Sequence, residues 1–142
     1  DSRMADTLDD LKRNLQSLAN SISSKLNERQ GYLDKADEIQ KVYDRLARDK
    51  KTIKEYRNDI VYFYKESYNE FKGDNYKYTY KPWIQDLRDS YDDVISNIDI
   101  NLDALNNQIL SYKNKASGCL GSLGYMQIAY NSVKTQIQNW TN

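Results

Sequence analysis

Residues that break helices are nearly absent from this chain, and their positions constrain its fold more than any other feature. The 142 residues include one proline, Pro82, and five glycines. Gly73 and Pro82 lie together in the stretch from Phe71 to Trp83, and long segments without proline flank it on both sides. Glycine ends helices readily, and proline fits the first turn of a new helix. Residues 72–81, which are rich in tyrosine, are therefore predicted to form the bend of a helical hairpin.

Residues 5–71 are predicted to form the first long helix. Apolar side chains recur there at steps of three and four residues, close to the seven-residue repeat of coiled coils. A continuous helix of this length would be a rod of roughly 100 Å. A polar stretch around Gly31 predicts a bend near that residue. The predicted apolar face comprises Leu8, Leu11, Leu15, Leu18, Ile22, Leu26, Leu33, Ala36, Ile39, Tyr43, Leu46, Ile53, Tyr56, Ile60, Tyr64, Ser67 or Tyr68, and Phe71.

Residues 82–116 are predicted to form the second long helix. Three glycines then recur in residues 117–124, which predicts a Gly-rich corner that ends this helix. A shorter amphipathic helix is expected over residues 125–141. The predicted fold class is all-α: one helical domain over residues 1–142, an elongated antiparallel hairpin with coiled-coil-like packing and a short C-terminal helix. The apolar series of the second helix comprises Trp83 or Ile84, Leu87, Tyr91, Val94, Ile98, Leu102, Leu105, Ile109 and Tyr112.

Charge favours a particular pairing of the two long helices. Residues 45–57 are mostly basic, whereas residues 92–103 carry four aspartates and no Lys or Arg. A hairpin centred near Lys77 would set Arg57 beside Asn97 and Lys50 beside Ala104. Exposed ion pairs contribute well under ~1 kcal/mol each, so charge selects the register more than it stabilises the fold.

Helix lengths predict a surface for a partner. A second helix of about 35 residues would cover only the later half of the first, and the C-terminal helix would cover part of the remainder. Exposed apolar stripes of this kind usually bind another protein. Aromatic residues also crowd the end of the first helix, and tyrosine suits interfaces. The predicted interface comprises Leu8, Leu11, Leu15, Leu18, Ile22, Leu26, Tyr62, Phe63 and Tyr68.

Several chemistries lack the residues that they need. The chain has no histidine and one cysteine, Cys119, so it lacks the usual catalytic triads and the commonest zinc ligand. We therefore expect no enzyme, no cofactor and no metal site. The net charge is zero, which does not favour nucleic acid. No apolar run reaches the ~20 residues of a membrane span, and residues 1–3 resemble an expression scar before Met4. We expect no stable membrane insertion, no cleaved signal peptide and a cytoplasmic location.

The chain resembles the small helical proteins of Gram-positive type VII secretion. Phe71-Lys72-Gly73 matches the aromatic-x-Gly turn of the WXG-type hairpins, with Phe in place of Trp, and Pro82 and Trp83 follow it. The similarity extends to the larger YwqH-like proteins encoded beside LXG toxins. Residues 31–36 are also similar to a segment of longer staphylococcal substrates of this pathway. WXG-type substrates carry Tyr-x-x-x-Asp/Glu after the second helix, whereas here the pattern occurs only at Tyr62 and Glu66, before the turn.

This resemblance implies a non-enzymatic targeting factor or chaperone. It would bind the helical N-terminal (LXG) region of a secreted toxin, together with a second small helical protein in some assemblies, and promote export. The chain itself would be cytoplasmic or co-secreted without a conventional signal. The alternative is a self-associating coiled-coil protein, structural or secreted, that forms a homodimer. A helix lying on a membrane surface is a third hypothesis, disfavoured because the helices lack a basic polar face.

Overall fold

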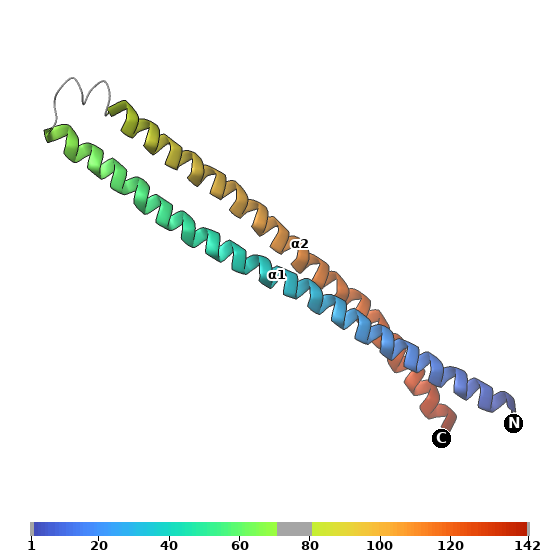
Figure 1. Cartoon of the computed structure of the whole chain (residues 1–142). Helices are drawn as coiled ribbons and strands as arrows, with labels where there is room; N and C mark the ends of the chain where they lie inside the picture. Colours follow the sequence, from blue (N-terminus) through green and yellow to red (C-terminus); the bar gives the residue numbers. More distant parts are fainter. Residues whose placement is uncertain (1, 71–80, 142) are drawn as a thin grey trace. The chain divides into compact units, whose positions relative to one another are not determined.

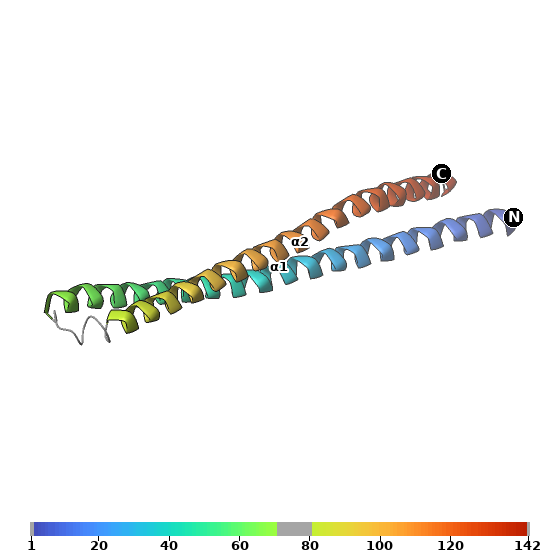
Figure 2. The ribbon, with the colours of Figure 1, turned by 90° about the horizontal axis from the view of Figure 1, so that it is seen from above.

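Two long helices make up the described part of the chain. The structure is a computed structural model that describes residues 2–70 and 81–141, and side chains in residues 7–66 and 81–141. Helix α1 spans Ser2–Glu70 and helix α2 spans Lys81–Thr141; these ranges contain no strand. The two helices pack against each other, which confirms the predicted all-α hairpin (Figures 1 and 2). Asp1–Asp37 with Ile109–Asn142 form unit 1, and Glu38–Gln108 form unit 2.

Side chains at three- and four-residue steps form the seam of each helix. None of these positions is exposed, whereas most positions between them are. The spacing is that of coiled-coil packing, in which alternate steps keep one stripe on the partner. The seam of α1 comprises Leu11, Leu15, Leu18, Ile22, Lys25, Arg29, Tyr32, Ala36, Ile39, Tyr43, Leu46, Lys50, Ile53, Arg57, Ile60 and Tyr64. The seam of α2 comprises Ile84, Arg88, Tyr91, Ile95, Ile98, Leu102, Leu105, Ile109, Tyr112, Ala116, Cys119, Leu123, Met126, Tyr130, Val133 and Ile137.

Helix α2 continues through the predicted Gly-rich corner. Residues 117–124 are helical, so residues 125–141 belong to α2 and no separate C-terminal helix is present among residues 81–141. The physical reason is the seam: Ala116, Cys119 and Leu123 keep the spacing, and the three glycines fall between seam positions. Burial along the seam offsets the ~1 kcal/mol that each glycine costs a helix. Helix α1 is also helical through Gly31, and the bend near that residue stays a prediction.

Three residues of the predicted apolar series, Leu26, Tyr56 and Val94, are exposed. The exposed fractions are 51% for Leu26, 54% for Tyr56 and 45% for Val94. Lys25, Arg57 and Ile95, each one residue away, are half-buried in their place. Regular spacing therefore outweighs the hydrophobicity of single residues here. Polar side chains at seam positions cost stability and help to fix the register of paired helices.

Ion pairs across unit 2 confirm the predicted charge complementarity and correct its register. Arg57 Nε donates to Asp92 Oδ1 at 2.7 Å, and Lys50 pairs with Asp99. Arg57 thus faces a residue five positions before the predicted Asn97, and Lys50 one five positions before Ala104. Aspartates recur along this part of α2, so charge alone accommodated either register. The seam spacing decides between them.

Candidate protein-interaction surface

The predicted interface along the start of α1 is partly covered within unit 1. Side chains from Leu8 to Ile22 on the predicted face are half-buried, at Leu8, Leu11, Leu15, Leu18 and Ile22. This part of α1 was expected to be bare because the second helix was predicted to end at residue 116. Since α2 extends to Thr141, unit 1 pairs it with this part of α1. Leu26 is the exposed residue among the members of the predicted interface between Leu8 and Leu26.

Aromatic side chains remain exposed near the end of α1 and the start of α2, within unit 2. The exposed fractions are 66% for Tyr62, 50% for Phe63 and 58% for Trp83. Tyr62, Phe63 and Tyr64 are consecutive, so a helix must point them in different directions. Tyr64 takes the seam position, which leaves Tyr62 and Phe63 outside it. We use the name aromatic surface for these exposed side chains together with Tyr56, namely Tyr56, Tyr62, Phe63 and Trp83, which lie on more than one helix face.

Part of the predicted turn lies outside the described residues. Phe71 and Gly73 lie outside the described residues, as does the side chain of Tyr68. Pro82 lies in the first turn of α2, where its missing N–H costs nothing. Tyr62 and Glu66, the candidate export motif, are four residues apart in α1 and both exposed.

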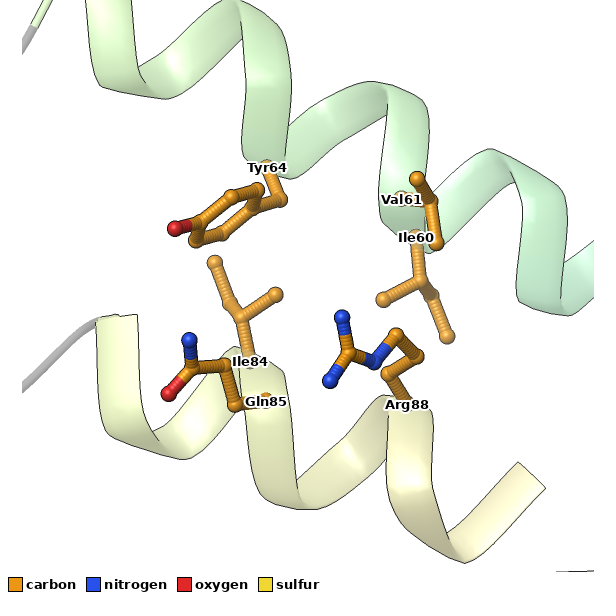
Figure 3. Close-up of a pocket in the computed structure, with 6 residues that line it drawn as sticks. All are labelled: Ile60, Val61, Tyr64, Ile84, Gln85 and Arg88. Atoms are coloured by element: carbon orange, nitrogen blue, oxygen red, sulfur yellow. The ribbon is translucent and has the colours of Figure 1, made fainter. Parts of the chain in front are cut away.

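The hollows of unit 2 are small. A cavity of about 20 Å³ lies between the helices, with Tyr64 and Ile84 facing each other across it and Arg88 beside them (Figure 3). It has room for about one water molecule and none for an organic ligand. A shallow, open groove of about 170 Å³ is lined by Ile53, Ser90, Tyr91 and Val94. It can accept one apolar side chain of a partner.

An ion pair on the flank of the unit 2 seam holds its groups in their charged forms. The guanidinium of Arg57 also approaches Asp92 through Nη2, at 3.5 Å from Oδ2. Hydrogen bonding from Arg57 lowers the pKa of Asp92 below its ordinary value, and the carboxylate raises the pKa of Arg57 in return. The two contacts orient the guanidinium against the carboxylate, the geometry that gives arginine pairs their specificity. The pair joins α1 to α2 within unit 2.

A second polar cluster lies in unit 1. The rings of Tyr32 and Tyr112 are 6.3 Å apart, and Lys115 Nζ lies 5.2 Å from the centre of the Tyr112 ring. Glu28 accepts hydrogen bonds from Lys25 at 2.8 Å and from the Tyr32 hydroxyl at 3.2 Å. Hydrogen bonding to Glu28 raises the pKa of both Lys25 and Tyr32, and the bond from Lys25 lowers the pKa of Glu28. Every charged group of this cluster thus has a partner, which is typical of a structural cluster.

The outer face of α2 in unit 1 is a surface that the sequence analysis missed. Between Lys115 and Lys134 lie 18 consecutive residues without a charged side chain, in a chain with 42 charged residues. Exposed fractions there are 52% for Leu120, 79% for Tyr125 and 69% for Ile128. The sequence signal for this surface is the absence of charged residues, whereas the prediction for this stretch rested on its glycines. A solvent-facing helix normally carries charged residues.

Metal ligation finds no support in the described ranges. Within residues 2–70 and 81–141, no three His, Cys, Asp or Glu side chains cluster so as to hold a metal ion. Cys119, the single cysteine, is buried in the α2 seam. No helix in the same ranges is apolar enough over a sufficient length to cross a membrane.

The comparisons with known proteins return no relative. The chain matches no protein-family model, no curated protein and no solved structure. The exposed surface of the chain is the remaining source of information on function. The chain exposes 10390 Å², against about 7,600 Å² expected for a globular monomer of the same mass. The excess is what two long paired helices, each burying one face, would leave exposed.

Proposed function

We propose that this chain is a non-enzymatic targeting factor that binds the helical N-terminal (LXG) region of a type VII-secreted toxin and promotes its export. The aromatic surface is the observation that carries the proposal. Large aromatic side chains with polar tips are enriched at the centres of interfaces. Tyr62, at 66% exposure, is its most accessible member. The connection to type VII secretion rests on the resemblance of Phe71-Lys72-Gly73 to the aromatic-x-Gly turn of the WXG-type hairpins.

The thin seam supports this role. Eight apolar side chains are buried among the described residues, and most of the seam is half-buried or polar. Two paired helices bury one face each, and a third or fourth helix from a partner would bury more apolar area at about 25 cal/mol per Å². The partner that fits is an amphipathic helix, which lays an apolar face along a groove between two others. Pairing with the toxin would keep both in the cytoplasm until export, or carry this chain out with it.

Co-expression with the N-terminal helical region of a toxin encoded next to this chain tests the proposal. Size-exclusion chromatography with light scattering should show a defined complex. The double variant Tyr56→Ser/Tyr62→Ser should lose it, because both side chains are about half exposed or more and belong to the aromatic surface. Tyr125→Ser, the same kind of change at one exposed tyrosine of unit 1, is the control and should retain it. If no complex forms, or if the two variants behave alike, the proposal is wrong.

The alternative function, a self-associating coiled-coil protein, is favoured by one observation, the neutral outer face of α2. It predicts a tight homodimer that ignores the toxin. Self-association and toxin binding are also compatible, because they would use different residues.

A further inference from the structure

The last part of α2 contacts α1 through fewer buried side chains than the rest of the helix does. We call residues 117–141 the C-terminal arm. Within residues 120–141, Val133 is the one buried side chain, and the other seam positions, Leu123, Met126, Tyr130 and Ile137, are half-buried. Before residue 120 the buried side chains of α2 are Ile84, Ile98, Leu102, Ile109, Ala116 and Cys119. The arm is therefore the part of α2 that apolar burial holds least firmly.

The arm begins where α2 has its lowest helix propensity. Gly118, Gly121 and Gly124 occupy exposed positions in its first turns. None of the three has a positive φ, and an added Cβ at each would meet no atom within 4 Å, so packing inside this chain does not require them. Glycine disfavours a helix interior because it has more conformational freedom to lose there. Isolated helices are marginal in water, so the arm depends on α1 to stay helical.

The seam of α1 beside the start of the arm is polar. Lys25, Arg29 and Tyr32 occupy three successive seam positions, and Cys119 of α2 lies near Lys25 and Tyr32. Lys25 and Tyr32 both donate hydrogen bonds to Glu28, a residue of α1 itself. The Nε of Arg29 is buried and has no hydrogen-bond partner among the described residues, which costs stability. These polar groups thus add little to the attachment of the arm.

Contacts between the helices are firmer just before the arm and in unit 2. The rings of Tyr32 and Tyr112 lie 6.3 Å apart across the two helices, and Ala116 is 2% exposed. In unit 2 the polar seam residue Arg57 pairs with Asp92 of the other helix. The weaker contacts therefore begin where the glycines begin, and the two features coincide in one segment of α2.

We propose that the C-terminal arm is a strap, which detaches from α1 and unfolds while unit 2 stays folded. In the closed form unit 1 pairs the arm with the part of α1 that carries Leu11, Leu15, Leu18 and Ile22, which belong to the interface predicted from the sequence. Detachment uncovers this stripe and Cys119 together. Proteins commonly open in such cooperative units without unfolding globally. The strap is a property of the isolated chain, so the proposal does not depend on the toxin.

Labelling of Cys119, the single cysteine, with a thiol reagent measures the detachment. Cys119 is 5% exposed, so the reagent reaches it when the arm detaches or when the whole chain unfolds. Dividing each labelling rate by the rate of the same chain in concentrated urea gives the open fraction. In water this fraction should exceed the globally unfolded fraction, extrapolated from circular dichroism, by about tenfold or more. Labelling that matches global unfolding would overturn the proposal.

Glycine-to-alanine variants distinguish the strap from opening of the whole hairpin. Gly118→Ala/Gly121→Ala/Gly124→Ala should slow labelling on the order of 100-fold, because each alanine favours the helical arm by about fivefold. Gly31→Ala is the matched control, at an exposed helical glycine of α1 with open space around it. It should leave the rate unchanged, because α1 stays helical when the arm detaches. Slowing by about fivefold in Gly31→Ala would mean that α1 unfolds too, and the strap would be refuted.

Two alanine variants of the α2 seam test where the opening lies. Val133, in the arm, and Ile98, in unit 2, are each 8% exposed. Val133→Ala should speed labelling in water by about tenfold or more, because it removes the buried contact of the arm. Ile98→Ala should leave that rate unchanged, because it weakens unit 2 alone. Equal acceleration by the two variants would contradict a separately detaching arm.

Discussion

Replacing the three glycines of residues 117–124 by alanine should stabilise the protein by about 2–3 kcal/mol. The perturbation is Gly118→Ala/Gly121→Ala/Gly124→Ala. All three residues are helical and exposed, none has a positive φ, and an added Cβ at each would meet no atom within 4 Å. Alanine favours a helix interior over glycine by 0.8–1.0 kcal/mol per residue, and nothing in the packing opposes the gain.

Urea unfolding followed by far-UV circular dichroism measures this effect. Low protein concentration keeps any dimer dissociated, so that the free energy of unfolding refers to one chain. Gly31→Ala, a single change at the fourth exposed helical glycine, should give about a third of the gain and serves as the control. Unchanged or reduced stability of the triple variant would mean that residues 117–124 form a turn in solution. The continuous α2 would then be wrong and the Gly-rich corner right.

Two further predictions concern the seam and the ion pair of unit 2. Ile98→Ala should lower the free energy of unfolding by about 2–4 kcal/mol, because Ile98 is only 8% exposed. Ile100→Ala should change it by less than about 0.5 kcal/mol, because Ile100 is 65% exposed. Equal effects of the two variants in urea titrations would contradict the seam assignment. Because Arg57 lowers the pKa of Asp92 in the folded state, the pair contributes stability above the unfolded pKa and loses it as pH falls through the folded one. Thermal melts should therefore show wild type more stable than Asp92→Asn at pH 6, with the difference shrinking as the pH falls through the acid range in which Asp92 is protonated; a difference that is constant with pH would rule out the pair.

The sequence predicted the helices and their pairing because both follow from periodic patterns. Steps of three and four residues identify a helix face whatever lies elsewhere in the chain, and opposite charges on residues 45–57 and 92–103 identify neighbours. The ion pairs Arg57–Asp92 and Lys50–Asp99 confirm this complementarity. The predicted pairing of the two helices differs by five residues from the observed one. Aspartates recur along α2, so opposite charge alone does not select one register.

The predictions that failed gave single residues more weight than the regular spacing of the seam positions. Glycine at positions 118, 121 and 124 was read as a break, although the seam continues through Ala116, Cys119 and Leu123. Leu26 and Tyr56 were placed on the apolar face of the first helix, although the observed seam runs through Lys25 and Arg57 instead. Polar seam residues are hard to recognise in a sequence, because some of their partners lie far along the chain, as Asp99 does for Lys50 and Asp92 for Arg57. The uncharged outer face of α2 in unit 1 was missed for the converse reason, because its distinguishing feature is the absence of charged side chains.

Hydrogen–deuterium exchange of the full chain, with and without the N-terminal helical region of the neighbouring toxin, tests the proposed targeting role most directly. Helices with few buried contacts open locally and exchange, and a bound partner slows that opening. The account predicts added protection in unit 2 around Tyr56 to Tyr64 and around Trp83, where the aromatic surface lies. Protection confined to residues 110–132, or none at all, would contradict it.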